Sequence, residues 1–128
     1  MLLDTSVLVE IFRSPITSRR TKRIMMEMGG EEAFVSIIQL AELADWAVRN
    51  RVSPKDRASS IREIARIVPL DEQICLDASS IKHQRRELGY TDFSLLDGIV
   101  LATARSIGQR VLTFDKDFEG ETDCTVIS

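Results

Sequence analysis

Short apolar runs of strand length alternate along the chain with longer segments of helical period. Five runs have the length and composition of β-strands: MLL at 1–3, AFVS at 33–36, ARIVPL at 65–70, RVLTF at 110–114 and CTVIS at 124–128. Helical segments between such runs are typical of an α/β domain with a mainly parallel sheet. The pattern therefore predicts a five-stranded, mainly parallel sheet covered by helices.

Several of these helices begin at recognisable capping residues. Ser36 and Ser94 open sequences of the capping-box type, and Ser53 is followed by a proline at the first helical position. In the helix after Ser36, one apolar stripe is expected to face the sheet, formed by Ile37, Leu40, Ala41, Ala44, Ala47 and Val48. The segment at 95–107 is apolar on nearly every side, and we expect that helix to be buried.

The size and composition are those of one globular domain, with 44% hydrophobic and 29% charged residues. No linker or internal repeat divides the chain, so we expect residues 1–128 to form a single domain. No run approaches the ~18 consecutive apolar residues of a membrane helix, and the N-terminus lacks a signal-peptide pattern, which predicts a cytoplasmic protein without membrane association. Cys75 and Cys124 have no metal-binding spacing and are interpreted as reduced core thiols.

Positive charge is concentrated in three clusters although the net charge is −3. The segment from Arg13 to Arg23 carries five cations and no acid, a second cluster lies at 82–86, and a third lies between 49 and 57. Each cluster alone is typical of a solvated helix face, and phosphate binding requires a partner feature elsewhere. The single histidine, His83, is expected at the surface.

Four acids are expected to meet at one edge of the sheet. In a parallel sheet, the carboxyl ends of the strands and the starts of the following helices lie on the same edge, where ligands bind. Asp4 follows the strand at 1–3, and Asp115 follows the strand at 110–114. Glu42 lies in the second turn of a helix that leaves this edge, within apolar surface, and Asp97 lies in the first turn of the buried helix.

Gathering carboxylates costs free energy unless a cation lies among them. A set of oxygen ligands suits Mg²⁺ or Mn²⁺, and the absence of a His/Cys cluster argues against zinc. Because Mg²⁺ often completes its coordination with phosphate, a phosphoester is the expected substrate. Each acid also has a purely structural interpretation. Asp97 and Asp4 could be helix caps, Asp115 a turn residue and Glu42 a surface acid. Their coincidence at one edge favours a metal site.

Four segments resemble the PIN-domain ribonucleases in order and spacing: LLDTSVLVE, IIQLAELADW, LLDGIVLATAR and VLTFDKDF. The compact length resembles the VapC toxins of type II toxin–antitoxin pairs, and the resemblance extends from Met1 to Phe118. It implies a three-layer α/β/α sandwich with a central parallel sheet. It also implies Mg²⁺- or Mn²⁺-dependent endonucleolytic cleavage of RNA, a homodimer, and an antitoxin partner lying over the methionine-rich segment RIMMEMGG. The alternative for that segment is ordinary core packing.

The acids of the family fall on the same four positions. Asp4 and Asp97 are expected to be the principal metal ligands, and Glu42 and Asp115 to complete a second metal site or orient the attacking water. The sequence does not divide those last two roles between them.

Several further residues have expected supporting roles. Thr113 matches a hydroxyl that the family places beside its last acid, and Asp117 and Ser6 are auxiliary candidates. At Gly98 the family usually has alanine, which is the one small departure. Candidates for contacts with the RNA backbone are Arg13, Arg19 and Arg20.

Other functions are weighed against the same residues. A haloacid-dehalogenase-type phosphatase needs a second acid two residues after its nucleophile, where this chain has Ser6. A phosphoacceptor receiver domain needs an acid pair after its first strand and gives Glu42 no role. A housekeeping RNA-processing nuclease and a non-catalytic PIN-like binding module stay open as alternatives.

Overall fold

The computed structural model describes residues 1–128 and contains one five-stranded sheet. The strands are β1 (Leu2–Leu3), β2 (Phe34–Ser36), β3 (Arg66–Val68), β4 (Val111–Thr113) and β5 (Cys124–Val126). Their order is β3-β2-β1-β4-β5, and every neighbouring pair is parallel. The predicted five-stranded parallel sheet is therefore confirmed.

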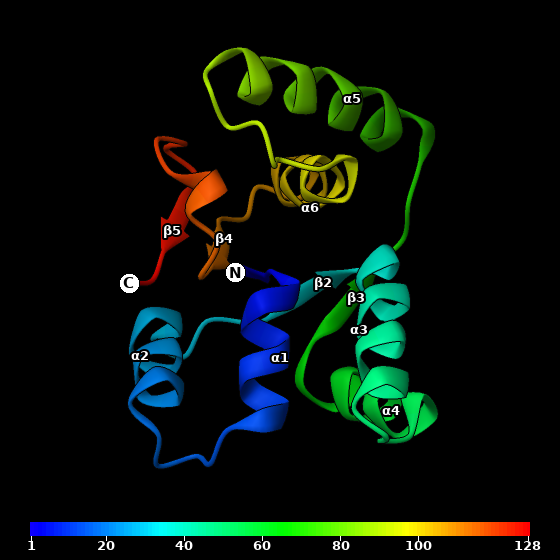
Figure 1. Ribbon diagram of the computed structural model, residues 1–128, viewed down its shortest axis with the longest axis vertical. Helices are drawn as coiled ribbons and strands as arrows, with labels where there is room; N and C mark the ends of the chain where they lie inside the picture. The colour runs from blue at the N-terminus through cyan, green and yellow to red at the C-terminus, as the bar shows by residue number, and fades with distance from the viewer.

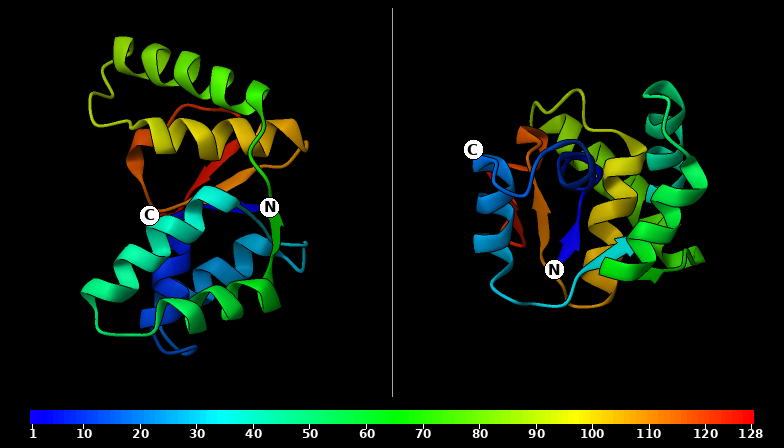
Figure 2. Two further views of the ribbon diagram at one scale, coloured as in Figure 1. Left: turned by 90° about the vertical axis from the view of Figure 1, so that its right-hand side faces the viewer. Right: turned by 90° about the horizontal axis from the view of Figure 1, so that it is seen from below.

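Helices cover both faces of this sheet. They are α1 (Thr5–Arg13), α2 (Arg19–Met28), α3 (Ile37–Arg49), α4 (Pro54–Ile64), α5 (Glu72–Glu87) and α6 (Leu95–Ser106), with a 3-10 turn η1 (Lys116–Phe118). Figure 1 shows α5 and α6 on one side of the sheet and α1 to α4 on the other, and the turned views of Figure 2 show the same separation. This arrangement confirms the three-layer α/β/α sandwich. None of the helices combines the length and apolar surface that a membrane crossing requires.

Alternation along the strands divides the core into two halves. Leu2 and Val111 belong to the cluster beneath α5 and α6, whereas their neighbours Leu3 and Leu112 belong to the cluster beneath the other helices. Successive side chains of a strand point to opposite faces, so a strand of two or three residues contributes to both halves. All four of these side chains are at most 1% exposed. The short central strands are therefore fixed from both sides.

Strand β1 marks the place where the order of the strands reverses. From β1 the chain moves outward through β2 to β3, then crosses by α5 and α6 to β4 on the other side of β1. Strands β1 and β4 pair directly, with Leu3 opposite Leu112. Ligands of open parallel sheets bind beyond the carboxyl ends of the strands at such a reversal. The residues after β1 and β4 are therefore the first candidates for a site.

The predicted helix starts are confirmed, but the predicted stripe of α3 is only partly correct. Ala47 is buried and Leu40 packs against the core, as expected. Ser36 and Ser94 form capping boxes, and the Ser53 side chain caps α4. The buried residues of α3 are Gln39, Leu43 and Ala47, whereas Val48 is 65% exposed and Ile37 39% exposed. The buried face also includes the polar residue Gln39, so a pattern of apolar positions alone displaces the predicted stripe from the face that is buried.

One cysteine also differs from its prediction. Both cysteines are free, but Cys75 is exposed and Cys124 is half-buried. In α5, Ile74 and Ala78 face the core, so the residue directly after Ile74 turns toward solvent. His83 on the same helix is exposed, as predicted.

Helices α5 and α6 pack so closely that one residue at their contact has no room for a side chain. A Cβ atom on Gly98 would lie 2.4 Å from the main-chain oxygen of Ala78 and 3.1 Å from its carbonyl carbon. Both atoms belong to the backbone, which cannot move aside as the end of a flexible side chain could. The glycine therefore sets the distance between the two helices, one residue after Asp97.

We expect Gly98→Ala to lower the free energy of unfolding by about 1–2 kcal/mol, because the cost of overpacking exceeds the gain in helix propensity. Urea denaturation followed by circular dichroism measures the change. Ser59→Ala, at an exposed position of α4, is the control in which propensity acts alone. A Gly98→Ala protein as stable as the wild type would contradict this account of the α5–α6 contact.

Candidate functional site

The Asp4 carboxylate is buried beyond the end of β1. Its side chain is at the N-cap position of α1 but makes no capping hydrogen bond, so the purely structural interpretation of this acid is wrong. Instead, the hydroxyls of Thr113 and Ser6 donate to its Oδ2 atom at 2.7 Å and 2.9 Å. With only 6% of the residue exposed, Asp4 is held between the ends of β1 and β4.

The same two hydroxyls tie Asp4 to the segment that follows β4. The Asp115 main-chain N–H donates to Thr113 Oγ1 at 2.9 Å, and the Phe114 N–H donates to Ser6 Oγ at 3.1 Å. Thr113 and Ser6, two of the three predicted auxiliary residues, therefore lie between Asp4 and Asp115. They bring together acids that are 111 positions apart in the sequence.

Glu42 reaches the site from α3 through two residues that the sequence pattern did not indicate. The Thr5 hydroxyl, directly after Asp4, donates to Glu42 Oε1 at 2.9 Å. Gln39, which is fully buried, donates to the Leu3 carbonyl at 2.6 Å and accepts from the Ser36 N–H at 2.8 Å. Gln39 thus joins the start of α3 to the end of β1. The one feature of the sequence that could have indicated this role is the position of Gln39 as the third helical residue of the Ser36 capping box.

Asp97 and Asp115 each use one oxygen for a local turn. Asp97 Oδ2 accepts from the Ser94 N–H at 2.8 Å, which completes the capping box of α6. Asp115 Oδ1 accepts from the Asp117 N–H at 2.9 Å and caps η1. The structural roles considered for these two acids are therefore real, but each role uses a single oxygen.

In all four acids the hydrogen bonds fall on one oxygen. The bonded atoms are Asp4 Oδ2, Glu42 Oε1, Asp97 Oδ2 and Asp115 Oδ1. Each carboxylate is thus oriented by the protein, and its second oxygen is left for another ligand.

Electrostatic repulsion acts between Asp4 and each of the other three acids. Burial raises the pKa of Asp4, and the neighbouring Asp115 adds to this rise. Burial also raises the pKa of Glu42, with Asp4 contributing, and raises the pKa of Asp97 to about 6, with Asp4 and Asp115 contributing. The structure therefore brings the four predicted acids into one electrostatic group.

No basic side chain forms an ion pair with any of these four acids. The carboxylates that do pair with arginines are Glu10, Glu32, Asp45, Glu121 and Asp123. An uncompensated set of oxygen donors fits a hard divalent cation such as Mg²⁺ or Mn²⁺. As the side chains lie, however, no three acids are placed to hold one ion together. Shared coordination would require some of the free oxygens to turn toward Asp4.

The remaining candidates lie around this group. Asp117 is half-buried, and burial raises its pKa, with Asp115 and Asp92 contributing. Arg13 and Arg20 both pair with the buried Glu10, at 3.0 Å and 3.3 Å. The Arg20 guanidinium also lies 4.9 Å from the ring centre of Phe114, next to Asp115.

Of the three arginines predicted to contact RNA, only Arg19 is free of an ion pair. It is exposed at the start of α2. The other two side chains are 56% and 57% exposed although they are paired, so their outer surfaces are open to solvent.

We expect Asp97→Asn to stabilise the metal-free protein at about pH 7.5. The pKa of Asp97 rises from 3.8 to about 6 on folding. The folded protein therefore favours the protonated acid, and this stabilisation is complete below pH 3.8. It is lost as the pH rises through 6, where the buried carboxylate becomes charged. Asparagine keeps an oxygen that can accept from Ser94 but carries no charge. The melting temperature in EDTA should rise relative to wild type at pH 7.5, with little difference at pH 4.

Asp71→Asn provides the control for this experiment. Asp71 caps α5 through its side chain and is exposed. Asp71→Asn should not raise the melting temperature at pH 7.5. An Asp97→Asn protein that melts no higher than wild type at pH 7.5 would show that the buried charge is not destabilising.

Comparison with known proteins agrees with the fold. The family model of the PIN domain matches residues 1–120. A search of curated proteins gave no match. Among solved structures, a toxin–antitoxin complex from Klebsiella pneumoniae superposes with a TM-score of 0.74 at 21% identity, covering 98% of this chain and 95% of that chain.

Two further structures have the same fold. FitAcB from Neisseria gonorrhoeae gives a TM-score of 0.71 at 26% identity, covering 99% of this chain and 96% of that chain. VapBC2 from Rickettsia felis, bound to a DNA fragment from their promoter, gives a TM-score of 0.74 at 12% identity, covering 98% and 96%. Because the family model spans nearly the whole chain, this chain belongs to the PIN domain family.

Proposed function

We propose that this chain is a metal-dependent endoribonuclease and the toxin of a VapBC-type toxin–antitoxin pair, acting in the cytoplasm. The observation that carries the proposal is the group of four oriented carboxylates with no basic partner beyond the ends of β1 and β4. PIN domains are generally nucleases, and the similar structures come from toxin–antitoxin complexes. Family membership gives no support to the phosphatase or the receiver domain.

In this proposal Asp4 and Asp97 are the principal ligands of Mg²⁺ or Mn²⁺. A bound ion would lower the pKa of a water molecule and stabilise negative charge on the phosphate oxygens of RNA. Glu42 and Asp115 complete the coordination or orient the attacking water. Their free oxygens make either role available.

The rest of the site prepares these acids. The Thr113 and Ser6 hydroxyls hold Asp4 Oδ2 and so present Oδ1 to a ligand. Thr5 holds Glu42 in the same way. These hydrogen bonds hold one oxygen of each acid, so ion binding requires only the second oxygens to reorient. The basic start of α2, with Arg19 free of an ion pair, is the proposed contact for the RNA backbone.

We expect Asp4→Asn and Asp97→Asn each to reduce cleavage of labelled RNA at least ~100-fold in Mg²⁺ or Mn²⁺, since even outer-shell partners of a metal typically contribute 10–100-fold. EDTA should abolish cleavage by the wild type. Asp45→Asn, at an exposed position of α3, is the control and should cleave like the wild type. Equal cleavage by all four proteins would remove the assignment, and a folded wild type without activity would favour the non-catalytic alternative.

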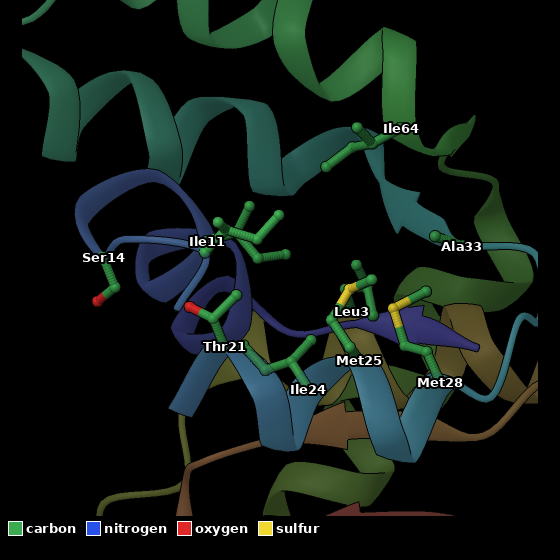
Figure 3. Close-up of a pocket in the computed structure, with 10 residues that line it drawn as sticks. Leu3, Ile11, Ser14, Thr21, Ile24, Met25, Met28, Ala33 and Ile64 are labelled. Carbon is green, nitrogen blue, oxygen red and sulfur yellow. The ribbon is translucent and has the colours of Figure 1, made fainter. Parts of the chain in front are cut away.

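The proposed antitoxin surface is an apolar cavity between α1 and α2. It has a volume of about 330 Å³, and its lining residues are Leu3, Ile11, Ser14, Ile16, Thr21, Ile24, Met25, Met28, Ala33 and Ile64. Figure 3 shows the side chains of α2 rising toward Ile11 of α1 and Ile64 of α4. Met25 is 62% exposed and Met26 76% exposed, so core packing does not account for these two methionines. An apolar antitoxin segment fits this surface, and the homodimer belongs to the same proposal.

We expect Met25→Glu to prevent co-purification with an antitoxin encoded beside the gene of this chain, because it would introduce a charge into an apolar cavity. Cleavage of RNA by the isolated variant should be unchanged. Met26→Glu is the matched control, since Met26 lies on the same helix but does not line the cavity. Loss of the complex in both variants, or in neither, would contradict the cavity as the docking surface.

Light scattering of the isolated chain tests the proposed homodimer.

A further inference from the structure

Arg85 is a buried arginine in a cluster that the sequence suggests is a solvated helix face. It lies near the end of α5, and its side chain is only 3% exposed. Every hydrogen bond of its guanidinium is made to the segment that follows β4. It pairs with Glu121 at 3.1 Å and donates to the main-chain oxygens of Asp117 and Glu119, the latter at 2.7 Å.

Aromatic rings complete the surroundings of this guanidinium. Its central carbon lies 3.9 Å from the ring centre of Tyr90 and 5.7 Å from that of Phe93. Phe93 in turn packs edge-on against Phe118, which is fully buried in the segment that Arg85 binds. The arginine is therefore enclosed between the α5–α6 connection and the turn η1.

This burial is costly, and packing alone does not explain it. A charge removed from water destabilises the fold unless it is paired and hydrogen-bonded, and here Arg85 Nε has no partner at all. An apolar side chain of similar length would fill the same space. A planar, forked guanidinium binds two carbonyls and a carboxylate at once in fixed directions, which the flexible ammonium of lysine does not.

The segment fixed in this way carries two acids of the site. Asp115 is the N-cap of η1, and Asp117 is the second residue of η1. The Asp117 carbonyl is held by Arg85, while the Asp117 N–H is held by Asp115 Oδ1. The backbone of Asp117 is thus bound from both sides, and this fixes the oxygen of Asp115 that does not face a ligand.

We propose that Arg85 is a positioning residue that holds the Asp115–Asp117 turn in the geometry required for divalent metal binding. Arg85 touches neither acid's free oxygen, so it acts through the backbone of the turn. The proposal rests on the function proposed above, because it assumes that these acids bind a metal ion.

The matched comparison is Arg85→Met against Arg105→Met. Arg105 belongs to the same ion-pair network, with bonds to Glu121 at 2.8 Å and Asp123 at 2.6 Å, but it touches neither of the carbonyls that Arg85 binds. Both substitutions remove one arginine from Glu121. Only Arg85→Met also removes the hydrogen bonds to the main-chain oxygens of Asp117 and Glu119.

Two measurements, made well below the melting temperature of every variant, separate positioning from general stability. Calorimetric titration with Mn²⁺ should show binding about tenfold weaker for Arg85→Met, the usual size of an outer-shell effect, and nearly unchanged for Arg105→Met. Amide hydrogen exchange of a peptide covering 115–121 should be about tenfold faster in Arg85→Met only, measured without metal. Arg85→Lys keeps the positive charge but lacks the forked guanidinium, so it should restore neither the Mn²⁺ affinity nor the slow exchange to wild-type values.

The result that would overturn the proposal is unchanged exchange and Mn²⁺ affinity in folded Arg85→Met, or equal losses in both methionine variants. If the wild type binds no Mn²⁺, the proposed function fails, but the exchange experiment still decides whether Arg85 holds the turn.

Discussion

The site depends on one buried interaction, the hydrogen bond from the Thr113 hydroxyl to Asp4. It joins the ends of the two central strands, β1 and β4, at the reversal of strand order. A carboxylate in this place is unfavourable, because it is removed from water and faces other acids without a cation of the protein to balance it. The fold thus accepts a local loss of stability in order to concentrate negative charge where a ligand can reach it.

The polar residues that surround this interaction follow a common plan. Hydroxyls and main-chain N–H groups each hold one oxygen of an acid, and buried polar side chains hold the backbone that carries those groups. Gln39 secures the start of α3 against β1, and Arg85 secures the turn after β4. Rigid support of this kind is what a site needs when its own charges repel one another.

Much of this could be predicted from the sequence, because the relevant signals are local. The apolar runs of strand length predict the sheet, and the capping serines predict where helices begin. The position of Asp4 and Asp115 directly after strands predicts that these acids meet at one edge. What could not be predicted depends on contacts between distant segments. Gln39 and Arg85 are polar, so their burial does not appear in any apolar pattern, and the closeness of α5 to α6 at Gly98 is set by packing alone.

The pairing of β4 beside β1 also bears on how the protein is made. Strand β1 is synthesised before β4, its partner on one side, which lies more than a hundred residues later in the chain. Until that late segment has been synthesised, Asp4 has neither the Thr113 hydroxyl nor the Asp115 carboxylate beside it. A chain that lacks β4 and the residues after it therefore cannot gather the complete group of four acids.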